Sequence, residues 1–365
     1  MNISIACSND PAQCVAQLKR GSAAVPKLVL FFASSKLDIG SAERVLHESY
    51  PQSELIGCST AGEISSGSMT EGMIVAMAIP EDYIDQAAAT YIENPGDPAE
   101  VAKATAAIEA VLSQPILGLD PSSYVGIVIV DGLSGAEERL MEKLGDLTDV
   151  PFIGGSAGDD LAFRKTWVSL RGISHDHGAV IAVLHAPKGY QIVKTQSFRT
   201  TGKRLIATAV NEATRTVVEF DRQPAADAYA AALGVSVSEL PALFMRHPLG
   251  LMMGLEPFVR SPQRISGTSV IFYCNMREGA ELEVLDSTDI VADTEAALAA
   301  QSPTTAAGLI NFHCILRTLE LRAENRCQEY GQLFAGVPTV GFSTYGEEYM
   351  GHMNQTSTML LFPGA

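Results

Sequence analysis

The sequence predicts an α/β (α+β) protein of two domains, in which mixed β-sheets are layered with outer helices. Three observations lead to this fold class. The chain has 365 residues, which is too long for one compact domain and enough for two of ordinary size. One segment plan, strand–helix–strand–turn–strand, occurs three times. Polar residues and Gly202 interrupt the pattern near residues 198–203, so we expect an N-terminal domain over residues 1–200 and a C-terminal domain over residues 201–365.

The repeated unit is an apolar strand, a helical stretch and a short strand that ends in a Gly/Ser turn closed by an acidic residue. The turns read GCSTAGE, GGSAGD and GFSTYGE. The first glycine of each turn follows the start of its unit by 29, 29 and 32 residues. These near-equal spacings indicate a repeated supersecondary unit. The three units cover residues 28–63, 125–159 and 309–347.

Local patterns predict the remaining elements in order. Apolar runs after the turns predict strands that are buried on at least one face, over residues 72–79, 178–185 and 357–362. The helical stretches inside the units are residues 42–51, 136–145 and 324–334. In the C-terminal half, β-branched residues on both sides of Asn211–Thr214 predict a hairpin. A helix should begin at Pro224 and stop at Gly234.

Charge and composition exclude several functions. The formal net charge is −17, and no Lys/Arg block offsets it, so we expect no nucleic-acid partner and no affinity for acidic lipid. The apolar runs are strand-length and shorter than the roughly 20 residues of a spanning helix, so we expect no membrane segment. Six cysteines in a chain of this length form no disulfide framework, and the N-terminus shows no secretory signal. We therefore expect a cytoplasmic protein.

The three turns are the first candidate binding site. GGSAG matches the nucleophile-elbow string, but that elbow requires a helix after the turn, and the sibling turns lack its spacing. We therefore favour tight structural turns that could also cradle an anion through their N–H groups. No nucleophile–base pair is supported either, so we expect no enzyme and assign no catalytic residue. The candidate ligand-binding residues are Ser59, Thr60, Glu63, Ser156, Ser343, Thr344 and Glu347.

The segment around His247 is the second candidate site. One imidazole lies in an apolar, Met-rich stretch, with several arginines near it in the sequence. An axial nitrogen, an apolar surrounding for the macrocycle and guanidinium partners for the propionates suit a haem. On spacing alone, the alternative is a histidine at the edge of the core that bonds to the backbone. The residues concerned are Arg246, His247, Met252, Arg260 and Arg264.

Taken together, the motifs resemble one family. They are LIGCSTAGEI (residues 55–64), PFIGGSAGDD (151–160), HPLGL (247–251) followed by FVRS (258–261), and VGFSTYGEE with NQT (340–356). In this order and at these separations the chain resembles the FIST sensory proteins, which have a FIST N-terminal and a FIST C-terminal domain. The resemblance covers nearly the whole chain. It implies small-ligand sensing and signal transduction rather than catalysis.

Within that family the chain is similar to a free-standing bacterial branch of nitric-oxide-sensing haemoproteins. This similarity implies haem b as cofactor, nitric oxide as gas ligand, and a partner histidine kinase or cyclic-di-GMP enzyme regulated by protein contact, as in two-component systems. The alternative is a FIST module without haem that binds an amino-acid-like ligand. The sequence leaves the formation of a homo-oligomer open.

If haem binds, we expect His247 to be its axial ligand and the metal-binding residue. The rival is His313, in a buried strand beside Cys314, although strand alternation puts these two side chains on opposite faces. His352 should lie in a mobile loop after the last turn. The resemblance also implies an arginine at the position of Arg317. We expect Arg317 to pair with Glu63 or Glu347 as a structural clamp.

Overall fold

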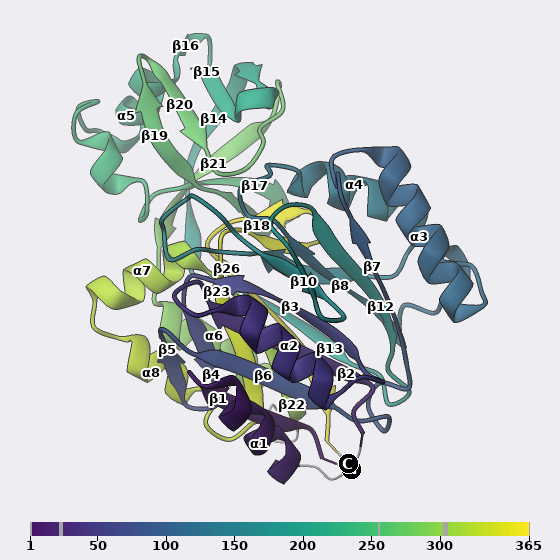
Figure 1. Cartoon of the computed structure of the whole chain (residues 1–365). Helices are drawn as coiled ribbons and strands as arrows, with labels where there is room; N and C mark the ends of the chain where they lie inside the picture. The colour runs from purple at the N-terminus through teal and green to yellow at the C-terminus, as the bar shows by residue number, and fades with distance from the viewer. Residues whose placement is uncertain (1, 22–24, 255, 302–305, 365) are drawn as a thin grey trace. The chain divides into compact units, whose positions relative to one another are not determined.

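The computed structural model describes residues 2–21, 25–254, 256–301 and 306–364 (Figure 1). The chain forms two compact units. Unit 1 comprises Met1–Thr195, Thr294–His352 and Ser357–Ala365, and unit 2 comprises Gln196–Asp293 and Met353–Thr356. Helices and strands occur in both, as the predicted α/β class requires.

Unit 1 contains three six-stranded mixed sheets, one for each predicted repeat. The first sheet has the order β1-β6-β2-β3-β10-β11, the second β25-β24-β9-β8-β12-β7 and the third β13-β26-β22-β23-β4-β5. The strands of the first sheet are β1 (Ser4–Ser8), β2 (Leu28–Ser34), β3 (Glu54–Thr60), β6 (Ile74–Ile79), β10 (Val168–Leu170) and β11 (Ile173–His175). Those of the second are β7 (Gln86–Ile92), β8 (Tyr124–Val130), β9 (Phe152–Ser156), β12 (Ala179–His185), β24 (Glu347–Tyr349) and β25 (His352–Met353). Those of the third are β4 (Glu63–Ser65), β5 (Ser68–Thr70), β13 (Gln191–Gln196), β22 (Ala306–Cys314), β23 (Thr339–Thr344) and β26 (Thr356–Pro363).

Each repeat places the same parallel pair at the centre of its sheet. The pairs are β2 with β3, β8 with β9, and β22 with β23. The predicted strand after each turn, β6, β12 or β26, then pairs antiparallel with the first strand of its repeat. The repeat inferred from the sequence is therefore a repeat in the structure.

A glycine stands at one equivalent position in each parallel pair. Gly57 lies opposite Phe31, Gly154 opposite Val128, and Gly341 opposite Asn311. A Cβ on Gly154 would lie 1.7 Å from the carbonyl oxygen of Val128, and a Cβ on Gly341 would lie 2.2 Å from that of Asn311. A Cβ on Gly57 would lie 2.3 Å from the ring of Phe31. These positions accept no side chain, which explains the first glycine of each turn motif.

The three repeats exchange short strands in a cycle. After the first turn, β4 pairs antiparallel with β23 of the third sheet. After the third turn, β24 pairs antiparallel with β9 of the second sheet. The segment after the second turn supplies β10, which pairs antiparallel with β3 of the first sheet. Each repeat therefore completes the sheet of another.

This exchange is the reason the observed units differ from the expected domains over residues 1–200 and 201–365. The third repeat lies in the C-terminal half of the chain, but its sheet includes β4 and β5 from the first repeat. It therefore belongs to the same compact unit as the first two repeats. Unit 2 is inserted in the sequence between the second and third repeats.

One hydrophobic core receives a face of all three sheets. Alternate residues of the central strands contribute to it, among them Phe32 of β2, Ile129 of β8 and Phe312 of β22. The ring centroids of Phe32 and Phe342 lie 4.6 Å apart, and those of Phe32 and Phe312 lie 6.2 Å apart. Contacts across this core join strands that are far apart in the sequence.

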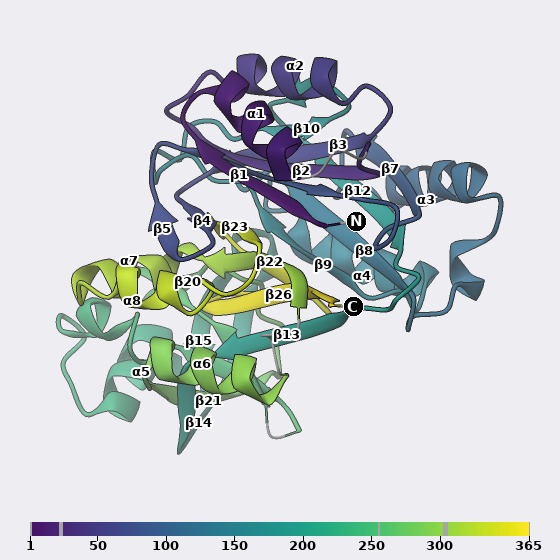
Figure 2. The same cartoon turned by 90° about the horizontal axis from the view of Figure 1, so that it is seen from below.

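Helices cover the opposite faces of the sheets. α1 (Pro11–Gly21) and α2 (Ile39–Ser49) lie along one face of the first sheet, as Figure 2 shows. α3 (Pro98–Leu112) and α4 (Glu137–Leu147) pack in the same way on the second sheet. α7 (Ile315–Ala323) follows β22 directly, and α8 (Cys327–Gln332) takes up part of the helix expected over residues 324–334. The sequence did not predict α7 as a separate helix.

Unit 2 is built on an eight-stranded sheet with the order β18-β17-β21-β14-β15-β20-β19 and β16 beside β15. Its strands are β14 (Phe198–Asn211), β15 (Thr216–Phe220), β16 (Gln223–Pro224), β17 (Leu249–Met253), β18 (Glu256–Arg260), β19 (Pro262–Ser266), β20 (Ser269–Phe272) and β21 (Glu281–Ser287). The predicted hairpin is β14–β15, and the predicted helix is α5 (Ala225–Leu233), which Gly234 closes with a φ of +75°. α6 (Ile290–Ala300) carries the chain back to unit 1. Three short 3₁₀ turns complete the elements, at Ile116–Gly118, Glu212–Thr214 and Leu240–Leu243.

Among the described residues, no helix is both long enough and apolar enough to cross a membrane.

Candidate functional site

The three Gly/Ser turns meet in unit 1. The first and third turns exchange two backbone hydrogen bonds: Ser343 N–H donates to Gly62 O at 2.7 Å, and Ala61 N–H donates to Ser343 O at 3.3 Å. The third and second turns are joined where Ser156 N–H donates to Gly346 O at 2.9 Å. We call residues 59–63, 156–159 and 343–347 the turn ring.

A third link closes the turn ring. Gly158 N–H of the second turn donates to Ser59 O of the first turn at 3.0 Å. Tyr345 N–H also donates to Ser156 O at 3.1 Å. All three turns are therefore fixed to one another through main-chain atoms.

The hydroxyl groups predicted to bind a ligand are brought together here and are buried. Ser156 Oγ donates to Glu137 Oε1 at 3.1 Å, and the hydroxyls of Ser343 and Thr318 lie 2.7 Å apart. Ser59 Oγ accepts Trp167 N–H at 2.9 Å. Two further bonds complete the set, from Thr60 Oγ1 to Glu63 and from Thr344 Oγ1 to Ser156 O. These bonds show that the turn ring holds the three repeats together. The binding of a ligand by the turn ring stays a prediction.

Glu63 is a turn-ring carboxyl whose acidity is altered by the fold. Burial raises the pKa of Glu63 to about 7, although the Thr60 hydroxyl and Met73 N–H lower it by donating to the carboxylate. Its charge therefore changes near neutral pH.

Asp159 anchors a loop at the edge of the turn ring. The sequence did not predict this loop. Its carboxylate accepts backbone N–H groups of three residues, Phe163, Arg164 and Lys165, and the Tyr345 hydroxyl at 2.5 Å. Burial acts against the charge of Asp159, but these donors lower its pKa. Phe163 is exposed and stacks on Tyr345, with ring centroids 5.0 Å apart. Asp160, Leu161 and Phe163 all have positive φ, so Asp159 holds a strained loop.

The third repeat carries polar residues where the other two carry apolar ones. The strand register aligns Asn311 with Phe31 and Val128, and aligns His313 with Ala33 and Val130. In the first two repeats these positions pack in the cores beneath the helices. An internal comparison of the repeats would have revealed this substitution in the sequence.

These polar side chains form a buried network, the third-repeat cluster, of Asn311, His313, Tyr330 and Ser357. Tyr330 Oη lies 2.9 Å from His313 Nδ1, and Ser357 Oγ donates to Asn311 Oδ1 at 2.8 Å. His313 Nε2 is buried without a hydrogen-bond partner. Burial lowers the pKa of His313 well below its ordinary value, and nearby Arg317 lowers it further, so the ring is neutral.

Arg317, expected to clamp a turn carboxylate, is fully buried beside this cluster. Its guanidinium donates to Thr294 Oγ1 at 3.0 Å. Glu63, one expected partner, is bound by Thr60 and Met73. The clamp to Glu347 stays a prediction.

His247 lies in unit 2, just before β17, and its ring is held by the neighbouring strand. Nδ1 lies 3.3 Å from the carbonyl oxygen of Leu285 and 3.6 Å from Asp286 Oδ1. A carbonyl oxygen only accepts, so this bond places a proton on Nδ1, and in the neutral ring the lone pair is then on Nε2. A ring fixed in this way is typical of metal-ligating histidines. The orientation of this ring is compatible with an axial ligand, and the binding of haem by His247 stays a prediction.

The other expected haem residues lie at different places. Arg260 is half-buried, and it lies opposite Leu249 in the β17–β18 pair. Arg246 and Arg264 are exposed, the latter on β19. Met252 points to the face of β17 opposite that of Leu249 and Leu251. Cys314 and His313 belong to unit 1, and their places on β22 put them on opposite faces of the strand.

Comparisons with known proteins identify the family. The FIST N domain matches residues 27–223, and the FIST C domain matches residues 225–350. An uncharacterized protein of Methanocaldococcus jannaschii is 24% identical over 285 residues, which are 72% of this chain and 54% of that protein, so the chain spans about half the length of this relative. Cyanuric acid hydrolase from A. caulinodans aligns over 100% of this chain and 99% of its own, at 9% identity and a TM-score of 0.39. The two domain matches cover most of the chain, which therefore belongs to the FIST family of sensory signalling proteins.

Proposed function

We propose that this FIST protein is a haem-based sensor of nitric oxide. The observation that carries the proposal is the hydrogen bond between His247 Nδ1 and Leu285 O, because it leaves Nε2 with a lone pair for a metal. Haem b would supply an iron atom that binds nitric oxide. The resemblance of the HPLGL and FVRS segments to the haemoprotein branch supports the same residue.

Hydrogen bonds from neighbouring residues fix the position of His247. His247 N–H donates to Leu243 O at 2.8 Å, and Tyr229 Oη donates to His247 O, so the backbone of His247 is fixed on two sides. Asp286, near Nδ1, would favour electron donation from the ring to a metal on Nε2. Arg260 would pair with a haem propionate, because it lies opposite Leu249, two residues after His247, in the β17–β18 pair.

The proposed output is protein contact in the cytoplasm. A net charge of −17 disfavours DNA as the target, so a histidine kinase or a cyclic-di-GMP enzyme is the proposed partner. The proposal assigns no chemical reaction to the chain.

The first experiment is the visible spectrum of protein purified from haem-supplied cells, before and after exposure to nitric oxide. We expect a Soret band that shifts with the gas. Purified kinase activity should then depend on the haem state when the sensor is present. A colourless protein that does not take up added haemin would contradict the proposal.

A second candidate function is the sensing of a small amino-acid-like ligand at the third-repeat cluster. The buried, unpartnered Nε2 of His313 favours it, because a buried polar atom without a partner is unfavourable and a ligand could satisfy it. The test is a thermal-shift screen of amino acids with the wild type and His313→Phe. A rise in Tm that only the wild type shows would support this function, and no rise with any amino acid would contradict it.

A further inference from the structure

A guanidinium, a carboxylate and an imidazole lie in one row across the sheet of unit 2. Asp286 of β21 is paired with Arg199 of β14 in the antiparallel register. On the other side of β21, the N–H of Ser287 donates to Arg246 O at 2.9 Å, which continues the β17–β21 pairing and places His247 opposite Asp286. Residues that lie opposite one another in antiparallel strands point to the same face of the sheet. The row therefore consists of Arg199, Asp286 and His247.

Pro248 explains why the imidazole is fixed at this place. In an antiparallel ladder the N–H of residue 248 would donate to Leu285 O, but proline has no N–H. Leu285 N–H still donates to Pro248 O at 2.9 Å, and Nδ1 of His247 lies 3.3 Å from Leu285 O. The histidine side chain thus takes the place of the missing backbone donor.

The two oxygens of the Asp286 carboxylate face different partners. Arg199 donates to Oδ2 from Nε at 3.0 Å and from Nη2 at 2.6 Å. Oδ1 lies 3.6 Å from Nδ1 of His247, which is too long for a hydrogen bond but close enough for the negative charge to act on the ring. The Arg199 side chain is 72% exposed, so this end of the row is open to solvent.

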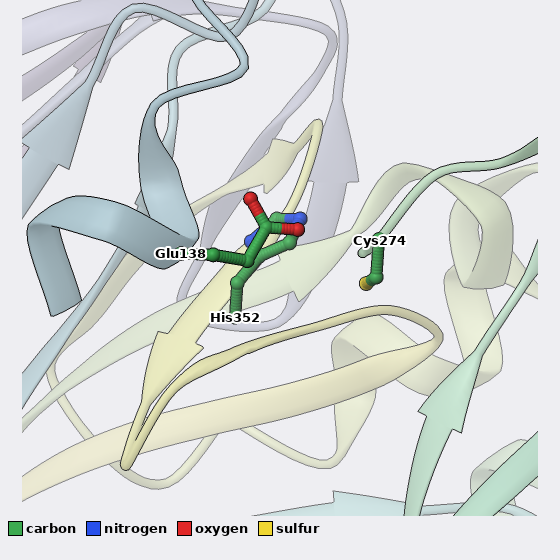
Figure 3. Close-up of side chains that lie close together, drawn as sticks. All are labelled: Glu138, Cys274 and His352. Atoms are coloured by element: carbon green, nitrogen blue, oxygen red, sulfur yellow. The ribbon is translucent and has the colours of Figure 1, made fainter. Parts of the chain in front are cut away.

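His352, the buried histidine of unit 1, has different surroundings. Its Nδ1 lies 2.8 Å from Oε1 of Glu348, and the Glu138 carboxylate lies beside its ring, as Figure 3 shows. The His352 side chain is 2% exposed, against 27% for His247. Within the part of the chain that the structure describes, no arginine binds Glu348, whereas Arg199 binds Asp286.

We propose that Arg199 and Asp286 are positioning residues that set how strongly His247 donates electrons to a bound haem. The inference rests on the proposed function, because it requires His247 to be the axial ligand. A carboxylate near the Nδ1 proton increases the basicity of an imidazole ligand, and this is one of the means by which a protein tunes a haem. Arg199 offsets the charge of Asp286, so it acts on the ring in the opposite direction.

The same two strands carry a matched row without a histidine. Arg204 of β14 is paired with Glu283 of β21, and its Nε lies 3.2 Å from Oε1 of that carboxylate. Gly250 of β17 lies opposite Glu283 on the other side. The Arg204 side chain is 62% exposed, close to the exposure of Arg199. Arg204→Ala is therefore the control, because it removes the same kind of cross-strand ion pair from the same strands.

The test measures the iron–histidine stretching frequency of the reduced haem protein by resonance Raman spectroscopy, together with the midpoint potential. Asp286→Asn keeps the shape of the side chain and leaves Leu285 O in place, so we expect a lower frequency and a higher potential than in the wild type. Arg199→Ala should shift both quantities in the opposite direction. The double variant should match Asp286→Asn, since Arg199 acts through Asp286. Arg204→Ala should change neither quantity.

Shifts of opposite sign in the two single variants distinguish this role from a structural one, because a general loss of packing would act in the same direction in both. Wild-type values in Asp286→Asn, or equal shifts in Arg199→Ala and Arg204→Ala, would overturn the inference and leave the haem sensor standing. If Asp286→Asn does not fold, Arg199→Ala decides, since an exposed ion pair contributes little stability. A wild type that takes up no haem would contradict the proposed function, and this inference with it.

Discussion

The backbone N–H of Ser343 donates to the carbonyl oxygen of Gly62 at 2.7 Å, although 281 positions of sequence separate the two residues. This bond joins the third Gly/Ser turn to the first. With the links from Ser156 to Gly346 and from Gly158 to Ser59, it makes the three repeats one cyclic unit. A change at any of the three turns should therefore affect the stability of the whole of unit 1.

Gly154→Ala should destabilise the protein by about 3 kcal/mol or more, because the new Cβ would lie 1.7 Å from Val128 O and the strands must separate. Gly145→Ala is the control. Gly145 lies inside α4 with nothing within 4 Å of an added Cβ, so alanine should raise stability by about 0.5–1 kcal/mol. Urea unfolding measures both changes. Equal stability of Gly154→Ala and the wild type would contradict the packing described for this pair.

Glu63 should make stability fall as pH rises from about 4.5 to about 7. Its pKa is raised by burial from 4.5 to about 7 in the fold, so the folded chain binds more protons than the unfolded chain across this window. The full contribution is about 3 kcal/mol, present below the unfolded pKa and lost above the folded one. Glu63→Gln should remove this part of the pH dependence in thermal unfolding between pH 4.5 and 8. An unchanged slope in the variant would show that Glu63 ionises normally.

Tyr345→Phe should loosen the loop that Asp159 anchors. The variant keeps the aromatic ring against Phe163 but loses the hydroxyl that donates to Asp159 and accepts Leu161 N–H at 2.8 Å. We expect a loss of about 1–3 kcal/mol and faster amide exchange over residues 160–165. Tyr91→Phe, which removes a single bond to His177 O, is the control and should change little. Unaltered exchange in Tyr345→Phe would mean that the loop is held by other contacts.

Arg317→Ala should lower the Tm, because it empties a fully buried position and removes the bond to Thr294. A loss of about 2–4 kcal/mol is expected. Arg326→Ala removes a partly exposed guanidinium that pairs with Glu329, and should cost about 1 kcal/mol or less. The two melting curves are measured side by side, and similar Tm values would argue against a structural role for Arg317.

The repeated unit could be predicted from the sequence because its signals are local. Apolar runs, a turn glycine and a closing acid recur at nearly equal spacing, and each corresponds to a strand or turn of the structure. The exchange of β4, β10 and β24 between sheets could not be predicted, because pairing with a distant strand leaves no local pattern. The same limit explains why the expected domain boundary at residue 200 does not coincide with the bounds of the two compact units.

The residues of the candidate sites could likewise be predicted only where their signal in the sequence is local. The turn residues Ser59, Ser156 and Ser343 could be grouped because each ends an equivalent strand. Glu137 could not be selected, since acidic residues occur throughout the sequence and only the fold shows which of them are buried. Asp159 was found only as the acid that closes the second turn, and its loop contacts were not. His352 is buried and begins β25, so the expectation of a mobile loop was wrong; β24 and β25 are each too short to give a periodic pattern in the sequence.

The account's central claim is tested most directly by the ferrous spectrum of His247→Ala beside that of His185→Ala. The two histidine side chains are 27% and 23% exposed, and both have an oxygen partner at Nδ1, so the variants remove similar contacts. We predict that His185→Ala keeps the Soret band of the wild type and its shift with nitric oxide, while His247→Ala loses or displaces the band and remains folded. A His247→Ala protein with the haem content and spectrum of the wild type would contradict the claim.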